Sequence, residues 1–279
     1  MKIWAHMLVK NEEKYLWYAV LSVVDYVDKV LLWDTGSTDK TLEICKKFQE
    51  KFPEKIDFRQ VKISSAEEFP KVRQEMLDAT DADWFLVVDG DEVWWEGSIK
   101  KVIVAIKKKG DQIESVAVPM IYPIGDIYHR QEEAAGGYHL VGKRGHISLR
   151  GVNKNIPGLS ASKPHGTFGW TDIDGKMIQD RDPQKVFFVE APYMHFSHLP
   201  RAGSVEDEKR VVKRPQKLKH ELGEAFPKDY YYPEVFFRKS PKIVPSPWER
   251  MDSGFYLRAL AETPFRKIKR RLLRPKVGY

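Results

Sequence analysis

The chain of 279 residues is 42% hydrophobic, which is enough for a substantial core in one large domain or two small ones. Its single cysteine excludes an intramolecular disulfide framework, and no apolar stretch approaches the roughly 18 residues that cross a bilayer. The net charge of +7 is matched by the seven basic residues, without an acid, between 266 and 279. The rest of the chain is therefore balanced, which argues against a broad nucleic-acid-binding surface.

The first 110 residues alternate between strand and helix patterns. Apolar runs predict strands over 3–9, 30–33, 58–63 and 84–88, and each run is followed by apolar residues at helical spacing. The first helix is expected to open at Asn11-Glu12-Glu13, whose acids suit the positive end of a helix dipole. The first strand follows Met1-Lys2 directly, without a cleavage site, so we expect a cytoplasmic protein. Strands that alternate with helices predict an α/β fold with a mainly parallel sheet.

The pattern changes after Gly110. Strands are expected over 115–121, 146–150, 186–190 and 193–196, and a charged helix over 206–222. Glycine, proline and serine are frequent between 151 and 175, which is typical of a long binding loop or lid. The stretch 227–247 is rich in proline and aromatic residues and should be mostly irregular. No internal repeat and no glycine-rich phosphate loop is found in the sequence.

The fourth strand ends in three carboxylates, Asp89, Asp91 and Glu92, spaced around Gly90. Carboxylates crowded at a strand end repel one another unless a cation or a set of donors lies between them. Oxygen ligands of this kind suit Mg²⁺ or Mn²⁺, which in proteins often also bind phosphate groups. In parallel sheets ligands lie beyond the carboxyl ends of the strands, so the loops after Val9, Trp33 and Val88 should share one crevice. The alternative is a solvated acidic turn.

A second polar loop, Asp34-Thr35-Gly36-Ser37-Thr38-Asp39-Lys40-Thr41, joins a strand to a helix, and by itself it could be an ordinary helix cap. Together with Lys10-Asn11-Glu12-Glu13, Arg73 and the Asp89-Gly90-Asp91-Glu92 end, however, it resembles the family 2 glycosyltransferases with a GT-A fold. The resemblance is close over about the first hundred residues and continues faintly to His195-Phe196-Ser197. It implies a Rossmann-like α/β fold, with a mixed, mainly parallel sheet flanked by helices and a C-terminal helical extension.

The resemblance also implies a domain organisation and roles for individual residues. A glycosyltransferase domain would span 1–225, with a nucleotide-binding half (1–110) and an acceptor half (111–225), followed by an extension over 226–279. Residues Val9, Lys10, Asn11 and Glu12 would bind the nucleoside together with Asp34, which would face the base. Arg73 would approach the pyrophosphate, unless it is a surface arginine. Asp91 would be the main ligand of Mn²⁺ or Mg²⁺, and Asp89 would contact the ribose or the metal-bound phosphates.

Two further assignments are less specific. His195 could be a further metal ligand or a phosphate donor, or a strand histidine without a metal. An inverting transfer needs a base for the acceptor hydroxyl. Relatives often carry a His-Glu pair after the acceptor-side strand, but here only His165-Gly166 is found. The candidates are Asp172, Asp174 and His165, of which Asp172 is preferred, although it could also be a solvated loop aspartate.

The C-terminal segment predicts a short amphipathic helix that starts at Thr263-Pro264. Phe265, Ile268 and Leu272 would lie on one side, with basic residues around them: Lys267, Arg270, Arg271 and Arg274. Such a helix suits an anionic membrane surface on the inner face of the membrane, and a flexible soluble tail is the alternative.

These observations predict a metal-dependent, inverting glycosyltransferase that moves a sugar from a nucleotide-sugar donor to a saccharide or lipid-linked acceptor in surface glycan assembly, without a nucleic-acid partner. The residues alone support only a nucleotide-phosphate and divalent-cation site. One alternative is a sugar-1-phosphate nucleotidyltransferase, but the loop Val9–Glu13 lacks the glycine-rich, basic character this reaction needs. The other is a non-enzymatic module that binds carbohydrate or membrane through structural Ca²⁺.

Overall fold

The computed structural model describes the chain except residues 64, 66, 164–168, 211–216 and 273–279. The predicted alternation of strands and helices is present in the first half. Its elements are β1 (Ile3–Val9), α1 (Leu16–Val23), β2 (Lys29–Asp34), α2 (Thr41–Lys51), β3 (Ile56–Gln60), α3 (Phe69–Asp78), β4 (Trp84–Val87), β5 (Glu92–Trp94) and α4 (Glu96–Lys109).

The second half is richer in short strands. Its larger elements are β6 (Ser115–Ile121), β7 (Pro123–Ile124), β8 (Asp126–Arg130), β11 (Ile147–Asn153), β14 (Val186–Phe188), β15 (Tyr193–His195), α5 (Val205–Lys209) and α7 (Ser253–Leu272). Small ladders and turns complete it: η1 (Glu133–Ala135), β9 (Tyr138–Leu140), β10 (Lys143–Gly145), β12 (Ser160–Ser162), β13 (Gly169–Thr171), η2 (Ile178–Asp180), η3 (Pro183–Lys185), β16 (Glu224–Ala225) and η4 (Glu234–Phe237).

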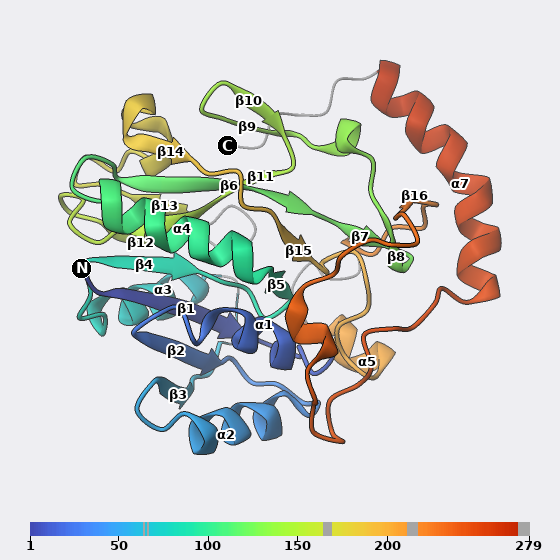
Figure 1. The fold of residues 1–279 in the computed structure, drawn as a ribbon, viewed down its shortest axis with the longest axis horizontal. Coiled ribbons are helices and arrows are strands. Elements are labelled where there is room, and N and C mark those ends of the chain that lie inside the picture. The colour runs from blue at the N-terminus through green and yellow to red at the C-terminus, as the bar shows by residue number, and fades with distance from the viewer. Residues whose placement is uncertain (64, 66, 164–168, 211–216, 273–279) are drawn as a thin grey trace.

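One large sheet organises the molecule, in the order β3-β2-β1-β4-β11-β6-β15-β5, with β14 paired to β6 (Figure 1). The pairs among β3, β2, β1 and β4 are parallel, as are β14 and β15 with β6, whereas β11 runs antiparallel to both β4 and β6. The predicted mixed, mainly parallel sheet flanked by helices is therefore confirmed. It matches the architecture expected of a GT-A fold.

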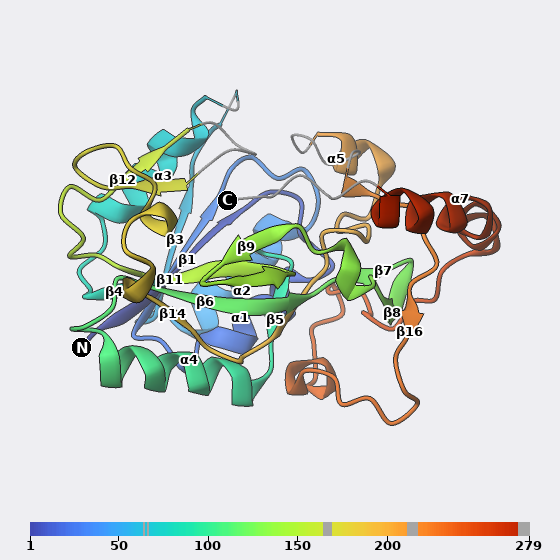
Figure 2. The ribbon, with the colours of Figure 1, turned by 90° about the horizontal axis from the view of Figure 1, so that it is seen from above.

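Helices cover both faces of the sheet, and Figure 2 shows α4 and α3 on opposite sides of it. Strand β4 illustrates why this is required: Trp84 and Leu86 belong to the core beneath α1, α2 and α4, whereas Phe85 and Val87 belong to the core on the other face. A strand buried on both faces reads as the continuous apolar run seen in the sequence. Its polar continuation, Asp89 to Glu92, is thereby fixed at the end of a rigid strand.

Several element boundaries differ from the prediction. Helix α1 begins at Leu16, five residues after Asn11, because Asn11 has a left-handed backbone (φ 52°) that a helix cannot include. The loop over 151–175 contains the β12–β13 ladder. Of the expected helix over 206–222, the described part is helical in α5 and again at Lys217, and it is irregular after Lys217. Residues 211–216 of that helix lie outside the described part of the chain.

The C-terminal helix also starts earlier than predicted. Helix α7 begins at Ser253, and Pro264 lies inside it. The Asp252 side chain accepts a hydrogen bond from the Phe255 backbone N–H (2.9 Å), which caps the first turn. Arg274 lies outside the described residues.

Candidate active site

The loops at the carboxyl ends of β1, β2 and β4 lie at one edge of the sheet. The parallel registers place Val9 opposite Asp34, and His6 opposite Val87. A Cβ atom added to Gly90 would lie 2.8 Å from the Glu12 Cγ atom. The acidic turn and the first loop are therefore in direct contact, and glycine is the residue that allows this approach. The sequence predicted that these two loops share one crevice.

The first and second loops are also joined by hydrogen bonds. The Asn11 backbone N–H donates to Ser37 Oγ (2.9 Å), and the Thr38 N–H donates to Asn11 Oδ1 (2.8 Å). The Glu12 N–H donates to Thr41 Oγ1 (2.8 Å). These bonds explain why Asn11 holds its left-handed conformation, which asparagine tolerates better than most residues.

Asp34 is almost fully buried and is bound within its own turn. Its Oδ1 atom accepts hydrogen bonds from the Gly36 N–H (2.9 Å) and the Ser37 N–H (3.0 Å), and its Oδ2 atom accepts one from the Ser37 hydroxyl. Gly36 has a φ of 96°, so glycine is the residue that fits this turn. The carboxylate thus shapes the second loop, and its contact with a base stays a prediction.

A segment after β15 covers both loops, which the sequence did not predict. Arg201 forms ion pairs with Glu12 and with Asp91 (Nη1 to Oδ2, 3.2 Å). In α5, the Asp207 carboxylate accepts a hydrogen bond from the Thr38 hydroxyl, and its backbone carbonyl accepts one from Asn11 Nδ2 (2.8 Å). Of the nucleoside residues expected from the sequence, Asn11 and Glu12 are therefore in contact with this segment.

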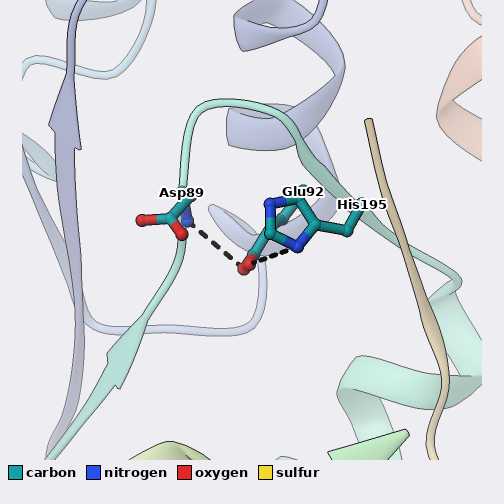
Figure 3. A group of neighbouring side chains, drawn as sticks. All are labelled: Asp89, Glu92 and His195. Atoms are coloured by element: carbon teal, nitrogen blue, oxygen red, sulfur yellow. Dashed lines mark hydrogen bonds and ion pairs between the residues drawn. The ribbon is translucent and has the colours of Figure 1, made fainter. Parts of the chain in front are cut away.

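Beyond β4, three side chains form a compact set of donor atoms: Asp89, Glu92 and His195. One ligand atom from each lies within 4.8 Å of the others (Figure 3). Antiparallel pairing places His195 of β15 opposite Glu92 of β5, so both side chains lie on one face of the sheet. His195 Nδ1 lies 3.6 Å from Glu92 Oε1, and the Asp89 backbone N–H donates to Glu92 Oε2 (3.3 Å).

This donor set fits a divalent cation. Two carboxylates and an imidazole are ligands that Mn²⁺ accepts readily, whereas Mg²⁺ prefers oxygen alone. The sequence assigned the principal ligand role to Asp91 and none to Glu92. In the structure the Asp91 carboxylate lies against Arg201 and is 3.4 Å from His195 Nε2, whereas Glu92 belongs to the compact set.

Two arginines from distant parts of the chain flank these acids. Arg73 of α3 places its Nη2 atom 3.5 Å from Asp89 Oδ1. Arg150 of β11 places its Nη2 atom 3.6 Å from Asp89 Oδ2 and also pairs with Glu92. Burial would raise the pKa of Asp89, but the charges of Arg150 and Arg73 outweigh it and hold that pKa below its ordinary value. At Glu92 the balance is reversed: burial raises the pKa to about 7 in spite of Arg150.

The donor set borders a cleft of about 620 Å³, which we call the central cleft. Asp89 and His195 contribute to its wall, and the aromatic side chains that line it are Phe69, Tyr122, Tyr138 and Trp170. Cationic groups line it as well: Arg73, Arg150, Lys163 and Lys217. The combination of aromatic rings and cations suits sugar rings that carry anionic groups.

The candidate bases differ in position. Asp172 is buried, accepts hydrogen bonds from the Asp174 N–H (3.0 Å) and the Lys176 N–H (2.9 Å), and pairs with Arg181. Among the described residues Asp172 does not line the central cleft, whereas Asp180 does. His165 lies outside the described residues, so its role stays a prediction, as does that of Asp172.

The sequence-level comparisons place these observations among known proteins. The family model described as Glycosyl transferase family 2 matches residues 5–172 of the chain. A TPR repeat-containing protein of Synechococcus elongatus is 28% identical over 130 residues. The match covers 47% of this chain and only 27% of the relative's length.

Solved structures show a more distant likeness. TarS residues 1–349 from S. aureus, in complex with UDP-GlcNAc, has a TM-score of 0.47 at 14% identity, covering 76% of this chain and 62% of that one. Glucosyl-3-phosphoglycerate synthase from Mycobacterium tuberculosis, in complex with Mn²⁺, UDP and glucosyl-3-phosphoglycerate, has a TM-score of 0.44 at 15% identity. The match covers 70% of this chain and 71% of the synthase chain.

Proposed function

The chain belongs to glycosyl transferase family 2, and from this premise we propose that the central cleft catalyses the metal-dependent, inverting transfer of a sugar from a nucleotide-sugar donor. The observation that carries the proposal is the donor set of Asp89, Glu92 and His195 in contact with two arginines at the edge of a cleft. A Mn²⁺ or Mg²⁺ ion bound there would act as a Lewis acid that stabilises the charge of the departing diphosphate.

The residues of the chain would bind and orient the donor. Arg73 and Arg150 place positive charge beside Asp89 at the cleft, where the diphosphate of a nucleotide sugar would lie. Asn11 and Asp34 would receive the nucleoside. Because Asp207 of α5 is hydrogen-bonded to Asn11 and Thr38, we propose that these Asp207 contacts break when the donor binds.

The acceptor would lie in the part of the central cleft formed by the second half of the chain. The rings of Tyr122, Tyr138 and Trp170 could stack on the apolar faces of sugar rings there. For the acceptor base we propose Asp180 ahead of Asp172, because Asp180 lines the cleft and the Asp172 carboxylate is bound by Arg181. The acceptor would be a saccharide or a lipid-linked saccharide of a surface glycan, used at the inner face of the membrane.

Two alternative functions predict different binding behaviour. A nucleotidyltransferase would bind a nucleoside triphosphate and a sugar phosphate, and a Ca²⁺-dependent module would bind the cation without any effect of nucleotide. Family membership argues against both, and calorimetry can separate them. We expect Mn²⁺ to bind the wild-type chain more tightly when a nucleoside diphosphate is present.

Single variants test the ligand set. Glu92→Gln and Asp89→Asn should each weaken Mn²⁺ binding by about tenfold or more, whereas Glu43→Gln on the exposed surface of α2 should leave it unchanged. Mn²⁺-dependent hydrolysis across a panel of nucleotide sugars would identify the donor, and Glu92→Gln should abolish it. If Asp91→Asn eliminates Mn²⁺ binding while Glu92→Gln retains it, the principal ligand is Asp91, as the sequence predicted. If no nucleotide sugar is consumed and nucleotides do not affect Mn²⁺ binding, the proposed function is wrong.

A further inference from the structure

Helix α7 packs on the rest of the chain through one face only. Ala259 and Thr263 are buried, and Thr263 Oγ1 accepts a hydrogen bond from the Leu222 backbone N–H (2.7 Å). Arg270 pairs with Glu132 (2.9 Å) and with the buried Glu221. These contacts fix the rotation of the helix about its axis, so the side of the helix that faces away from the protein is defined.

That opposite side is strongly apolar. Of the thirteen large hydrophobic residues that are exposed in the described chain, six belong to α7. At 100° per residue, five of them form one stripe, which we call the outer face: Leu257, Leu260, Phe265, Ile268 and Leu272. Their exposed fractions run from 50% for Leu260 to 77% for Leu272. Single exposed apolar residues are common on protein surfaces, whereas a contiguous exposed apolar patch marks a binding surface.

Basic residues border the outer face on both sides. By helical geometry Lys267 lies outside one edge of the stripe, Arg271 lies just inside that edge, and Lys269 lies outside the other edge. These three residues form no ion pair with any part of the chain that the structure describes. The one acid of the helix, Glu262, pairs with Arg258 and Arg266. The outer face is therefore apolar at its centre and cationic at its edges.

We propose that the outer face of α7 is a docking surface for an anionic lipid bilayer. The helix would lie in the plane of the interface, with the five apolar side chains inserted and the basic side chains at the level of the headgroups. No described helix is long and apolar enough to cross a membrane, so this attachment would be peripheral. The structure changes the sequence-based version of this idea, because Arg270 faces the protein and the apolar stripe reaches back to Leu257.

Charge and chemistry favour a bilayer over the other occupants. A second copy of the chain would bring two sets of cations together, which repel. A surface that binds a protein partner usually carries polar groups as well as apolar ones, because protein interfaces have about one hydrogen bond per 100–200 Å². Between Leu257 and Leu272 the other residues within this arc are Ala261, Pro264 and Arg271, so its one polar side chain is a cation.

The position of α7 would also hold the central cleft near the membrane. Both ribbon views place α7 at the edge of the molecule, beyond the small sheet of β16, β8 and β7 (Figure 1, Figure 2). Glu221, to which Arg270 is paired, lies four residues from Lys217 in the wall of the cleft. None of the outer-face residues lines the cleft, so docking and sugar transfer can be tested separately.

Flotation of the full chain with vesicles tests the proposal. We expect binding to vesicles of phosphatidylcholine with about one-third phosphatidylglycerol, and weaker binding to phosphatidylcholine alone or at about 1 M salt. The charge variant Lys267→Glu/Lys269→Glu/Arg271→Glu and the apolar variant Phe265→Ser/Ile268→Ser should each reduce binding by about tenfold or more.

Control variants make comparable changes on other exposed helices. Lys46→Glu/Lys107→Glu/Lys108→Glu alters three exposed lysines on α2 and α4, and Val104→Ser removes an exposed apolar side chain of α4. Both should bind vesicles as the wild type does.

Mn²⁺ and nucleoside diphosphate binding, measured without vesicles, should be unchanged in every variant, which keeps this proposal separate from the transfer reaction. Wild-type binding that is absent, or that both α7 variants retain, would overturn the proposal. A dimer in sedimentation equilibrium that Phe265→Ser/Ile268→Ser dissociates would instead assign the outer face to a second copy.

Discussion

Arg201 connects the first loop to the acidic turn, and its removal should destabilise the protein strongly. Its guanidinium lies 3.2 Å from the Asp91 carboxylate and also pairs with Glu12. The exposed fractions of these side chains are 10% for Arg201, 4% for Glu12 and 1% for Asp91. Burial would lower the pKa of Arg201, but the charges of Glu12 and Asp91 outweigh it and raise that pKa above its ordinary value.

Arg201→Met would therefore leave two buried carboxylates without their shared cation. Breaking a buried ion pair by removing one partner costs about 3–5 kcal/mol, because the remaining charge stays desolvated. With an m-value of about 3 kcal/mol/M, the midpoint of urea unfolding should fall by at least about 1 M. The measurement is a urea titration in the presence of a chelator, so that no bound cation compensates for the missing guanidinium.

Two further variants separate charge from packing. Arg210→Met removes an arginine that is 57% exposed and pairs with Asp207, and it should cost less than about 1 kcal/mol. The neutral triple variant Glu12→Gln/Asp91→Asn/Arg201→Met should recover most of the stability lost by Arg201→Met, since it contains no uncompensated charge at this position. A loss below about 1 kcal/mol for Arg201→Met, or no recovery in the triple variant, would refute the electrostatic reasoning.

Two other predictions concern buried groups near the site. Burial, with the charges of Arg73 and Lys154, holds the pKa of His6 well below its ordinary value, so only the unfolded chain takes up a proton near pH 6.5. His6 should therefore lower the free energy of unfolding by about 1.4 kcal/mol as the pH falls from about 7.5 to 5.5. A series of urea or thermal unfolding measurements should show this contribution in the wild type and not in His6→Gln. An equal pH dependence in the two proteins would contradict the prediction. Gly90→Ala would place a Cβ atom 2.8 Å from the Glu12 Cγ atom and should cost about 1–3 kcal/mol, with weaker Mn²⁺ binding by calorimetry; a fully stable variant would contradict the close packing.

The fold was largely predictable from local patterns. Continuous apolar runs identified β1, β2, β4 and β6, because strands buried on both faces of a sheet leave a strong signal. The start of α7 was missed for a physical reason. Thr263-Pro264 is a good helix start in isolation, but the helix begins at the Asp252 cap and continues through Pro264. Pro264 has no N–H to donate to the Leu260 backbone carbonyl, four residues earlier. Leu260 is half-exposed, so the helix can continue through the proline with this hydrogen bond missing.

The candidate site was predictable only in part. Asp34 ends one apolar strand and Asp89 follows another, so a local motif reveals them. Arg150 and Arg201 carry no such signal, because their partners are brought to them by the sheet: Arg201 and Glu12 are 189 residues apart in sequence. Glu92 was visible but received no role, since only the pairing of β5 with β15 places it beside His195.

The charges around the acidic turn suggest why cation and nucleotide should bind together. The cluster contains four carboxylates and three guanidinium groups: Glu12, Asp89, Asp91 and Glu92, with Arg73, Arg150 and Arg201. Its formal charge is close to neutral, so a divalent cation alone or a diphosphate alone would each leave an uncompensated charge in a poorly hydrated site. Bound together, the two cancel. Each ligand should therefore raise the affinity of the other by the same factor, and this mutual effect distinguishes a donor site from a structural cation site.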